Sequence, residues 1–258
     1  AIALIGVLIM LYPTIASWFS QYNLALALQQ QSVELTQLGE EERLQTVARA
    51  EQYNRHLLAG VAVDPFSMQV ANTDSQRYQD YLGQLHRTDS GIMARIRIPS
   101  INVDLPVYHG TAPTTLEHGV GHLFGTALLV GGSGTHSVLT AHRGLPEAEL
   151  FTHLDRVREG DLIEIVVYDQ LVHYRVTGIQ VVLPHETSSL VPVPGADLLT
   201  LVTCTPYAVN SHRLLVTGED QLTRRERRRR DRLGRLVADA DGRELLFELT
   251  DQVLRIGD

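Results

Sequence analysis

The chain opens with an apolar stretch whose length suits a membrane span. No charged residue occurs before Glu34, and residues 1–19 are mostly hydrophobic. A helix that crosses the hydrocarbon core needs about 20 such residues. Trp18, Phe19 and Tyr22 follow where an aromatic belt would lie. We therefore expect residues 1–19 to be a transmembrane anchor that the numbered sequence contains only in part. A cleaved signal peptide or a core helix is the alternative, although no small-residue cleavage site follows.

Residues 20–90 are predicted to be mainly helical. Leucine, alanine, glutamine and glutamate dominate the first part of this region, and its apolar positions follow a helical spacing. We expect one long helix, or a helical hairpin that breaks near Gly39. Residues 61–75 form an irregular segment, and a short helix over Gln76–Leu85 leads to the main domain.

From residue 91 to residue 218 the pattern changes to the alternation typical of β-strands. Short β-rich runs are separated by connections that contain glycine or proline. This succession predicts a mainly β fold, a closed antiparallel or mixed barrel rather than a βαβ sheet. One short helix is expected over Glu149–Val157. The β-rich runs are Ile92–Ile98, Val103–Tyr108, Ser137–Ala141, Leu162–Tyr168, His173–Val182, Leu198–Thr203 and Arg213–Thr217.

Composition limits the classes of function. With 258 residues, of which 44% are hydrophobic, the chain suits one folded domain with appendages. Its formal net charge of −8 argues against a nucleic-acid partner. Residues 219–258 form a charged and then amphipathic tail. The arginine-rich run within it, residues 224–232, favours a solvated helix face or a contact with anionic lipid or cell-wall polymer.

Cys204 is the only cysteine, which excludes an internal disulfide and a cysteine-rich metal site. It ends a strand-like run and precedes Pro206, so its thiol could face a cleft from a rigid backbone. A small buried side chain is the commoner role of a lone cysteine, and position by itself leaves both roles open. The acidic residues between Asp155 and Glu164 do not match a calcium loop, and we predict no metal and no cofactor.

A reactive thiol needs a partner that handles protons. His142 ends one strand-like run, and Arg213 begins another. Together with Cys204 they would form a sensible set for acyl transfer. The thiolate attacks a carbonyl, the imidazolium protonates the leaving amine, and the guanidinium stabilises the oxyanion or orients the substrate.

Three motifs carry a resemblance to a known family. Thr200-Leu201-Val202-Thr203-Cys204 matches the TLxTC signature of sortases, which are cysteine transpeptidases. Leu139–His142 resembles the segment with their catalytic histidine, and Asn210–Val216 resembles the strand with their catalytic arginine. The resemblance covers roughly residues 91–218. It implies a barrel of about eight strands, with Cys204 as nucleophile, His142 as general acid and Arg213 as the oxyanion or substrate clamp.

The tripeptide Asp64-Pro65-Phe66 is by itself an ordinary turn sequence. Beside a sortase domain it resembles the lid of the class C, pilus-assembling sortases. That resemblance implies that Asp64 pairs with Arg213 and that Phe66 covers Cys204.

The resemblance implies a membrane-anchored enzyme on the outer face of a Gram-positive bacterium. It would cleave an LPxTG-like sorting signal through a thioester at Cys204 and pass the product to a lysine amine of a pilin subunit. One alternative is a sortase that attaches surface proteins to cell-wall peptide. The other, from a different class, is a membrane-tethered β-barrel binding module with an inert cysteine. A papain-like hydrolase would need its cysteine on a helix near the N-terminus.

Overall fold

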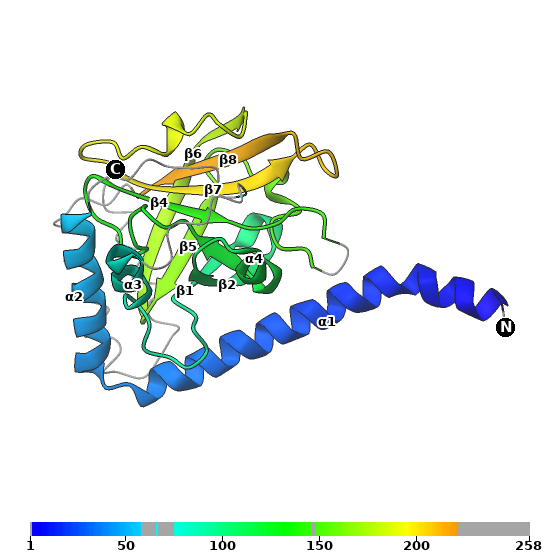
Figure 1. The fold of residues 1–258 in the computed structure, drawn as a ribbon, viewed down its shortest axis with the longest axis horizontal. Helices are drawn as coiled ribbons and strands as arrows, with labels where there is room; N and C mark the ends of the chain where they lie inside the picture. Colours follow the sequence, from blue (N-terminus) through cyan, green and yellow to red (C-terminus); the bar gives the residue numbers. More distant parts are fainter. Residues whose placement is uncertain (1, 58–65, 67–74, 146–147, 221–258) are drawn as a thin grey trace, which may run out of the picture. The chain divides into compact units, whose positions relative to one another are not determined.

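Eight strands close into a barrel in the computed structural model of this chain (Figure 1). The structure describes residues 2–57, 66, 75–145 and 148–220, with backbone alone for 2–10 and 13. The strand order around the barrel is β1-β2-β3-β4-β7-β8-β6-β5. The predicted mainly β fold is confirmed. The strands are β1 (Ala94–Ile98), β2 (Val103–His109), β3 (Val120–His122), β4 (Thr135–Thr140), β5 (Leu162–Val167), β6 (Gln170–Val182), β7 (Asp197–Thr205) and β8 (His212–Glu219).

The barrel is mixed, because two of its strand pairs are parallel. These are β2 with β3, joined through the short helix α4 (Pro113–His118), and β4 with β7. All other neighbouring strands are antiparallel. Parallel strands end at the same edge of a sheet. The carboxyl ends of β4 and β7 therefore lie side by side, with Thr140 opposite Val202.

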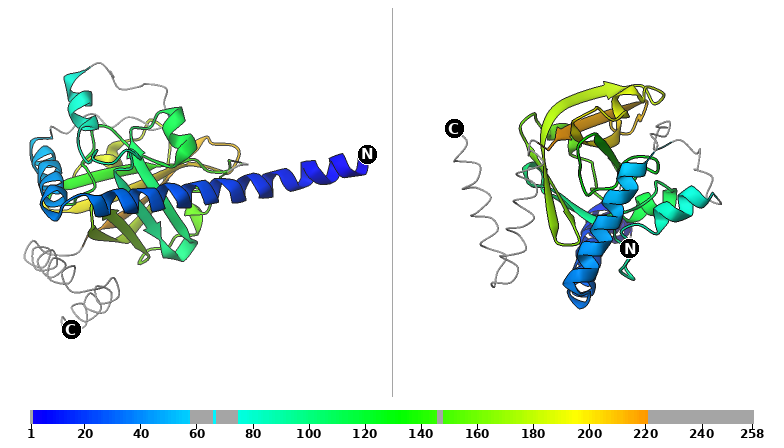
Figure 2. Two further views of the ribbon diagram at one scale, coloured as in Figure 1. Left: turned by 90° about the horizontal axis from the view of Figure 1, so that it is seen from below. Right: turned by 90° about the vertical axis from the view of Figure 1, so that its left-hand side faces the viewer.

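Three helices precede the barrel: α1 (Ile2–Gln37), α2 (Glu40–His56) and α3 (Gln76–Leu82) (Figures 1 and 2). The break predicted near Gly39 is confirmed. Arg43 stabilises it, because its guanidinium donates to the carbonyls of Leu35 and Leu38 at the end of α1 and pairs with Asp169. The two helices are also tied to the barrel domain by side-chain hydrogen bonds. These run from Gln31 to the carbonyl of Ile92 and between Asn54 and both backbone groups of Leu128.

The strands pack into two apolar clusters, one on each of their faces. The larger one is the barrel core, to which Leu199 and Leu201 of β7 belong. Val202, between them and the strand end, belongs to the smaller one. Successive side chains of a strand point to opposite faces. The smaller cluster, called the outer cluster below, therefore covers the outside of β4, β7 and β8. Its buried members are Leu123, Val138, Leu190, Val202 and Leu215.

The β5–β6 hairpin illustrates how local chemistry determines the turns. Its loop consists of Tyr168 and Asp169, which both have positive φ, 46° and 67°. This is the backbone of a two-residue turn whose twist matches that of the flanking strands.

One predicted helix is wrong. Instead of a helix over Glu149–Val157 there is a loop that contains only the 3-10 turn Leu154–Arg156. Leu150 has a φ of 37°, which is incompatible with a continuous α-helix. Phe151 and Leu154 are fully buried, so packing into the barrel core replaces helical hydrogen bonding as the source of order.

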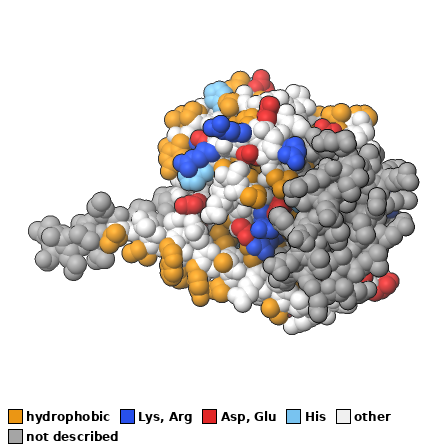
Figure 3. Space-filling view, turned by 180° about the vertical axis from the view of Figure 1, so that it is seen from behind, with side chains coloured by type: hydrophobic (Ala, Val, Ile, Leu, Met, Phe, Trp, Pro, Cys, Tyr) orange, Lys and Arg blue, Asp and Glu red, His pale blue; other side chains and the backbone are white. Residues whose placement is uncertain are grey.

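No helix with described side chains is long and apolar enough to cross a membrane. Of the anchor expected over residues 1–19, the side chains of residues 1–10 and 13 lie outside the described residues, and so does the tail from 221 to 258. On the described surface seen from behind, acidic and basic side chains lie next to one another (Figure 3). Ion pairs of the barrel include an exposed one, Arg95 with Asp104, and a partly buried one, Arg97 with Glu164.

Helix α3 is held against the barrel by a buried aromatic cluster. The ring of Tyr81 lies against His109 and His122, with centroid separations of 5.0 and 5.6 Å. His122 Nε2 contacts the carbonyl of Ala127, which can only accept, so Nε2 carries a hydrogen and donates it. The Tyr81 hydroxyl contacts His122 Nδ1 at 2.9 Å and donates to the carbonyl of His122 at 3.0 Å. Burial lowers the pKa of His122 to about 4. Burial and the neighbouring His122 lower the pKa of His109 to about 4. Both rings are therefore neutral at physiological pH.

These two histidines should make the fold sensitive to acid. Their pKa is lower in the folded protein than the ordinary value of about 6.5. Their contribution to stability is therefore complete above pH ~6.5 and is lost as the pH falls. Each histidine taken alone should reduce the free energy of unfolding by about 2 kcal/mol between pH 7.5 and pH 5. Urea unfolding at the two pH values measures this loss. His109→Gln should reduce the pH dependence, whereas His118→Gln, on an exposed position, should leave it unchanged; equal pH dependence in all three proteins would contradict the assignment.

Candidate active site

Cys204 and Arg213 face each other across two neighbouring strands. They are directly opposite in the antiparallel register of β7 and β8. The next pair on the same face, Val202 and Leu215, belongs to the outer cluster. Side chains opposite one another on one face have Cβ atoms about 5 Å apart. The structure thus brings the sulfur and the guanidinium together on the outside of the barrel, at the carboxyl end of β7.

Arg213 is nearly buried, with 9% of its surface exposed. Its Nη1 donates to the carbonyls of Asn210 and His212, at 3.2 and 3.1 Å. Both acceptors lie in or beside the β7–β8 loop, so the guanidinium is held by the backbone of its own hairpin. A planar cation fixed in this way can donate further hydrogen bonds to a carbonyl or an oxyanion.

His142 reaches the same place from β4. The parallel pairing of Thr140 with Val202 continues in a hydrogen bond from Ala141 N to the carbonyl of Val202. Extending that register by one more residue places His142 beside Cys204. The imidazole is half-buried, and burial lowers its pKa below the usual value, an effect that the carboxylate of Glu117 partly opposes.

Phe66 covers two members of this set. Its ring centroid lies 5.7 Å from that of His142, and the guanidinium carbon of Arg213 lies 5.1 Å from the same ring. The ring also packs on the outer cluster. A cation over an aromatic face is attracted by its quadrupole. Phe66 therefore joins His142 and Arg213 through one apolar contact and one cation–π contact, while Asp64 lies outside the described residues.

The other motif residues of β7 have structural positions. Leu201 is fully buried in the barrel core. The Thr203 hydroxyl donates to the carbonyl of Ala141 at 2.8 Å, which ties the strand of Cys204 to the segment that precedes His142.

Thr200 belongs to a buried chain of hydrogen bonds. His136 Nδ1 faces the carbonyl of Val191, so it must carry the hydrogen, and His136 Nε2 accepts from the Thr200 hydroxyl at 2.7 Å. Thr200 in turn contacts the hydroxyl of Thr217 at 2.9 Å. Burial lowers the pKa of His136, which keeps it in the neutral form that this chain requires. The chain joins β4, β7 and β8 to the β6–β7 connection.

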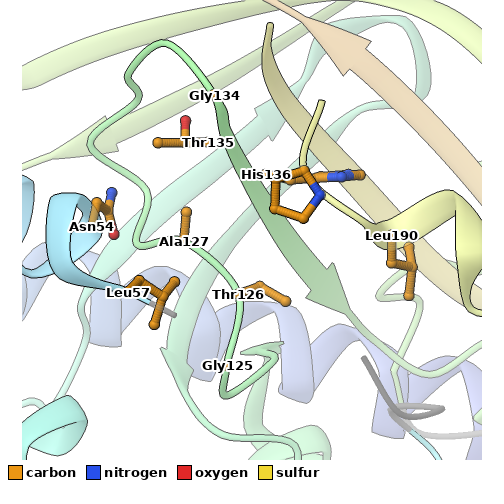
Figure 4. Close-up of a pocket in the computed structure, with 10 residues that line it drawn as sticks. Asn54, Leu57, Gly125, Thr126, Ala127, Gly134, Thr135, His136 and Leu190 are labelled. Carbon is orange, nitrogen blue, oxygen red and sulfur yellow. The ribbon is translucent and has the colours of Figure 1, made fainter. Parts of the chain in front are cut away.

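A pocket in the described part of the protein lies beside His136 rather than beside Cys204 (Figure 4). Asn54 and Leu57 from α2 line one side of it. Since the imidazole of His136 is occupied by Thr200 and Val191, we attach no chemistry to this pocket.

Two neighbours of His142 make contacts that the sequence did not predict. Arg143 donates to Thr205 and Asp155 from the position directly after His142. Gly144 has a φ of 79°, and a Cβ there would lie 2.7 Å from the ring of Tyr207. The sequence contains a signal for Arg143 only in its adjacency to His142, because both of its contacts are distant along the chain.

Comparison with known proteins agrees with this geometry. The sortase domain family matches residues 96–221. The chain is 50% identical in sequence to sortase C-1 from Actinomyces oris, whose crystal structure is similar, with a TM-score of 0.66. The similarity covers 70% of this chain and 99% of that one. It belongs to the sortase family. It is also similar to sortase A from Corynebacterium diphtheriae, at 43% identity, 79% and 96% coverage and a TM-score of 0.69.

Sortase C from Streptococcus pneumoniae is 35% identical, with a TM-score of 0.68 over 77% of this sortase and 97% of that chain. Among curated proteins, sortase A from Bacillus anthracis is 29% identical over 128 residues, which cover 50% of this chain and 59% of that protein. The chain thus spans less than two thirds of the length of the curated sortases A that it matches.

The contact between Phe66 and His142 should depress the pKa of the imidazole. Removal of the ring in Phe66→Ala should raise the pKa of His142, because water then reaches the charged form. The conservative variant Phe66→Leu keeps an apolar cover and should show a smaller rise. NMR titration of the histidine ring signals, with His142→Gln to identify the resonance, measures both shifts. An unchanged pKa in Phe66→Ala would show that other groups bury the ring.

Proposed function

We propose that this sortase is a transpeptidase in which Cys204 is the nucleophile, His142 the general acid and base, and Arg213 the oxyanion or substrate clamp. The observation that carries the proposal is the placement of Cys204 opposite Arg213 at the strand end that His142 flanks. Membership of a family of cysteine transpeptidases supports it.

The proposed reaction has two acyl transfers. The thiolate of Cys204 attacks the threonine carbonyl of an LPxTG-like sorting signal, and the Arg213 guanidinium stabilises the oxyanion. The peptide C–N bond breaks as the His142 imidazolium gives its proton to the leaving amine, which leaves a thioester. A lysine amine of an acceptor protein then attacks the thioester, His142 accepts the amine proton, and the thiolate is released. These 258 residues contain no lysine, which fits an acceptor on another protein.

The covered site suits a resting state. With ordinary pKa values near 8.5 and 6.5, a thiolate and an imidazolium coexist in about 1% of molecules at pH 7. Burial lowers the pKa of His142 and so disfavours the imidazolium further. Phe66 lies over His142 and Arg213. We propose that it is the tip of a lid over residues 61–75, with Asp64 as a second anchor on Arg213. Opening of the lid would expose the site and restore the acid form together.

Pilus assembly is the favoured setting. Several structural neighbours are sortases C, among them a pilus-related sortase C of group B Streptococcus and sortase C from S. pneumoniae, whose structure bears on pilin substrate specificity. By analogy, the donor and acceptor substrates would be pilin subunits. The protein would be anchored through residues 1–19, with the catalytic domain on the outer face of a Gram-positive cell.

Attachment of surface proteins to cell-wall peptide is the second candidate, because several curated matches are named sortase A. Incubation with a purified pilin, and separately with a wall-peptide amine, distinguishes the two. Pilin multimers joined through lysine indicate pilus assembly, whereas transfer to the wall peptide alone indicates the second function.

Formation of the acyl-enzyme tests the proposed chemistry. When the full chain is incubated with an LPxTG peptide, mass spectrometry should find an adduct on Cys204 that Cys204→Ala lacks. Phe66→Ala should accumulate the adduct severalfold faster, because the ring no longer covers the site and the pKa of His142 rises. Tyr207→Ala removes a different exposed aromatic near the site and serves as a control for general loosening. No adduct in either wild type or Phe66→Ala would count against the enzyme and in favour of a binding module.

A further inference from the structure

Arg143 connects three segments around the site. Its Nη1 donates to the Thr205 hydroxyl at 3.1 Å, and its Nη2 pairs with Asp155 at 2.6 Å. The arginine side chain is only 9% exposed, whereas the Asp155 side chain is 48% exposed. Its buried Nε makes no hydrogen bond within the described part of the chain. A guanidinium held this tightly, at the cost of one unpaired N–H, calls for a role beyond surface charge.

The contact with Thr205 lies behind the catalytic face. Leu199 and Leu201 of β7 point into the barrel core, whereas Val202 points to the outer cluster. By the same alternation, Cys204 shares the face of Val202, and Thr203 and Thr205 share the opposite one. Arg143 therefore touches β7 on the side away from the thiol. It can influence Cys204 through the backbone, but it does not contact a substrate on the outer face.

Two contacts enclose the nucleophile and its partner. The Thr203 hydroxyl bonds to the carbonyl of Ala141 at 2.8 Å, one residue before His142. The Thr205 hydroxyl accepts from Arg143, one residue after His142. The residues on either side of Cys204 are thus linked to the residues on either side of His142. We call these two contacts the bracket.

The loop that follows His142 is secured on its far side as well. Phe151 N donates to the carbonyl of His142 at 3.1 Å, and Gly144 N donates to the Thr152 hydroxyl at 3.1 Å. Asp155, in the 3-10 turn of that loop, then binds Arg143. The second half of the bracket is therefore itself supported by a folded loop.

We propose that Arg143 and Thr205 are positioning residues that align the imidazole of His142 with the thiol of Cys204. This inference extends the proposed transpeptidase function and rests on it. Proton transfer between such groups requires heavy atoms about 2.6–3.2 Å apart, and a displacement of about 1 Å costs on the order of 100-fold in rate. Main-chain pairing of β4 ends near Ala141, so the side-chain contact of Arg143 is what continues the alignment past His142.

Substitutions in the Phe66→Ala background test the bracket without the cover. Thr205→Val removes the hydroxyl at nearly constant volume, and Thr205→Ser retains it. Arg143→Met removes the donor groups and keeps the aliphatic stem. We expect Thr205→Val and Arg143→Met each to lower the maximal rate of acyl-enzyme formation 10- to 100-fold, with less than a threefold change in KM. Thr205→Ser should recover most of the lost rate.

Matched variants separate positioning from stability. Arg95→Met breaks another arginine–aspartate pair, with Asp104 between β1 and β2, and should leave the rate unchanged. The double variant Arg143→Met/Thr205→Val should be no slower than the worse single variant, because each substitution removes the same contact, between Arg143 and Thr205. If the two effects multiply, or if Arg95→Met slows acylation as much, the bracket is not a positioning device.

A second measurement needs no sorting peptide. In Phe66→Ala, the pH profile of Cys204 alkylation by iodoacetamide should differ from that of Phe66→Ala/His142→Gln, because the imidazole lies near the thiol. Thr205→Val and Arg143→Met should move the profile towards that of the His142→Gln variant, and Thr205→Ser should leave it unchanged. If His142→Gln does not alter the profile, His142 and Cys204 are uncoupled and the bracket proposal fails. A profile that depends on His142 without any acyl-enzyme would instead count against the transpeptidase function alone.

Discussion

The parallel pairing of β4 with β7 is the constraint on which the site depends. It places two strand ends at one edge of the barrel, so that His142 continues from one and Cys204 sits on the other. The antiparallel pairing of β7 with β8 adds Arg213 directly opposite Cys204. A shift of one residue in either register would turn the thiol toward the barrel core. Such a shift would also turn Leu199 and Leu201 out of the barrel core. The packing of the core therefore maintains the geometry of the site.

The cover of the site combines steric and electrostatic effects. Phe66 lies against His142 and under the Arg213 guanidinium, and it packs on the outer cluster. An apolar ring over an imidazole excludes water, which disfavours the protonated form. In the proposed mechanism, the contact that blocks a substrate also disfavours the acid form of His142. A cover held by a few such contacts can open at modest cost.

The buried histidines elsewhere in the barrel differ from His142 in what surrounds them. His122 and His136 each use both ring nitrogens in buried hydrogen bonds, and burial lowers the pKa of both, which favours the neutral ring. They attach α3 and the β6–β7 connection to the barrel. His142 is only half-buried and lies at a strand end. Solvent access and hydrogen-bond partners therefore suit His122 and His136 to a structural role and His142 to proton transfer.

The sequence by itself determined most of the strand runs and, through the motif around Cys204, the family and the candidate residues. It left open whether the N-terminal helical region breaks near Gly39, and the structure shows that it does. Strand alternation and the TLVTC run are local signals, so they survive without knowledge of the fold. The sequence did not reveal β3, whose three residues are ordered by the neighbouring strands β2 and β4. The helix that it predicted over Glu149–Val157 is a loop.

Only the tertiary structure decided that His122 and His136 are held by buried hydrogen bonds, whereas His142 is half-buried just after β4. It also decided that Arg143 reaches Thr205 and Asp155, and that Phe66 reaches Arg213. These contacts join residues far apart in the chain. Their partners are chosen by barrel closure and strand register, which no local pattern encodes.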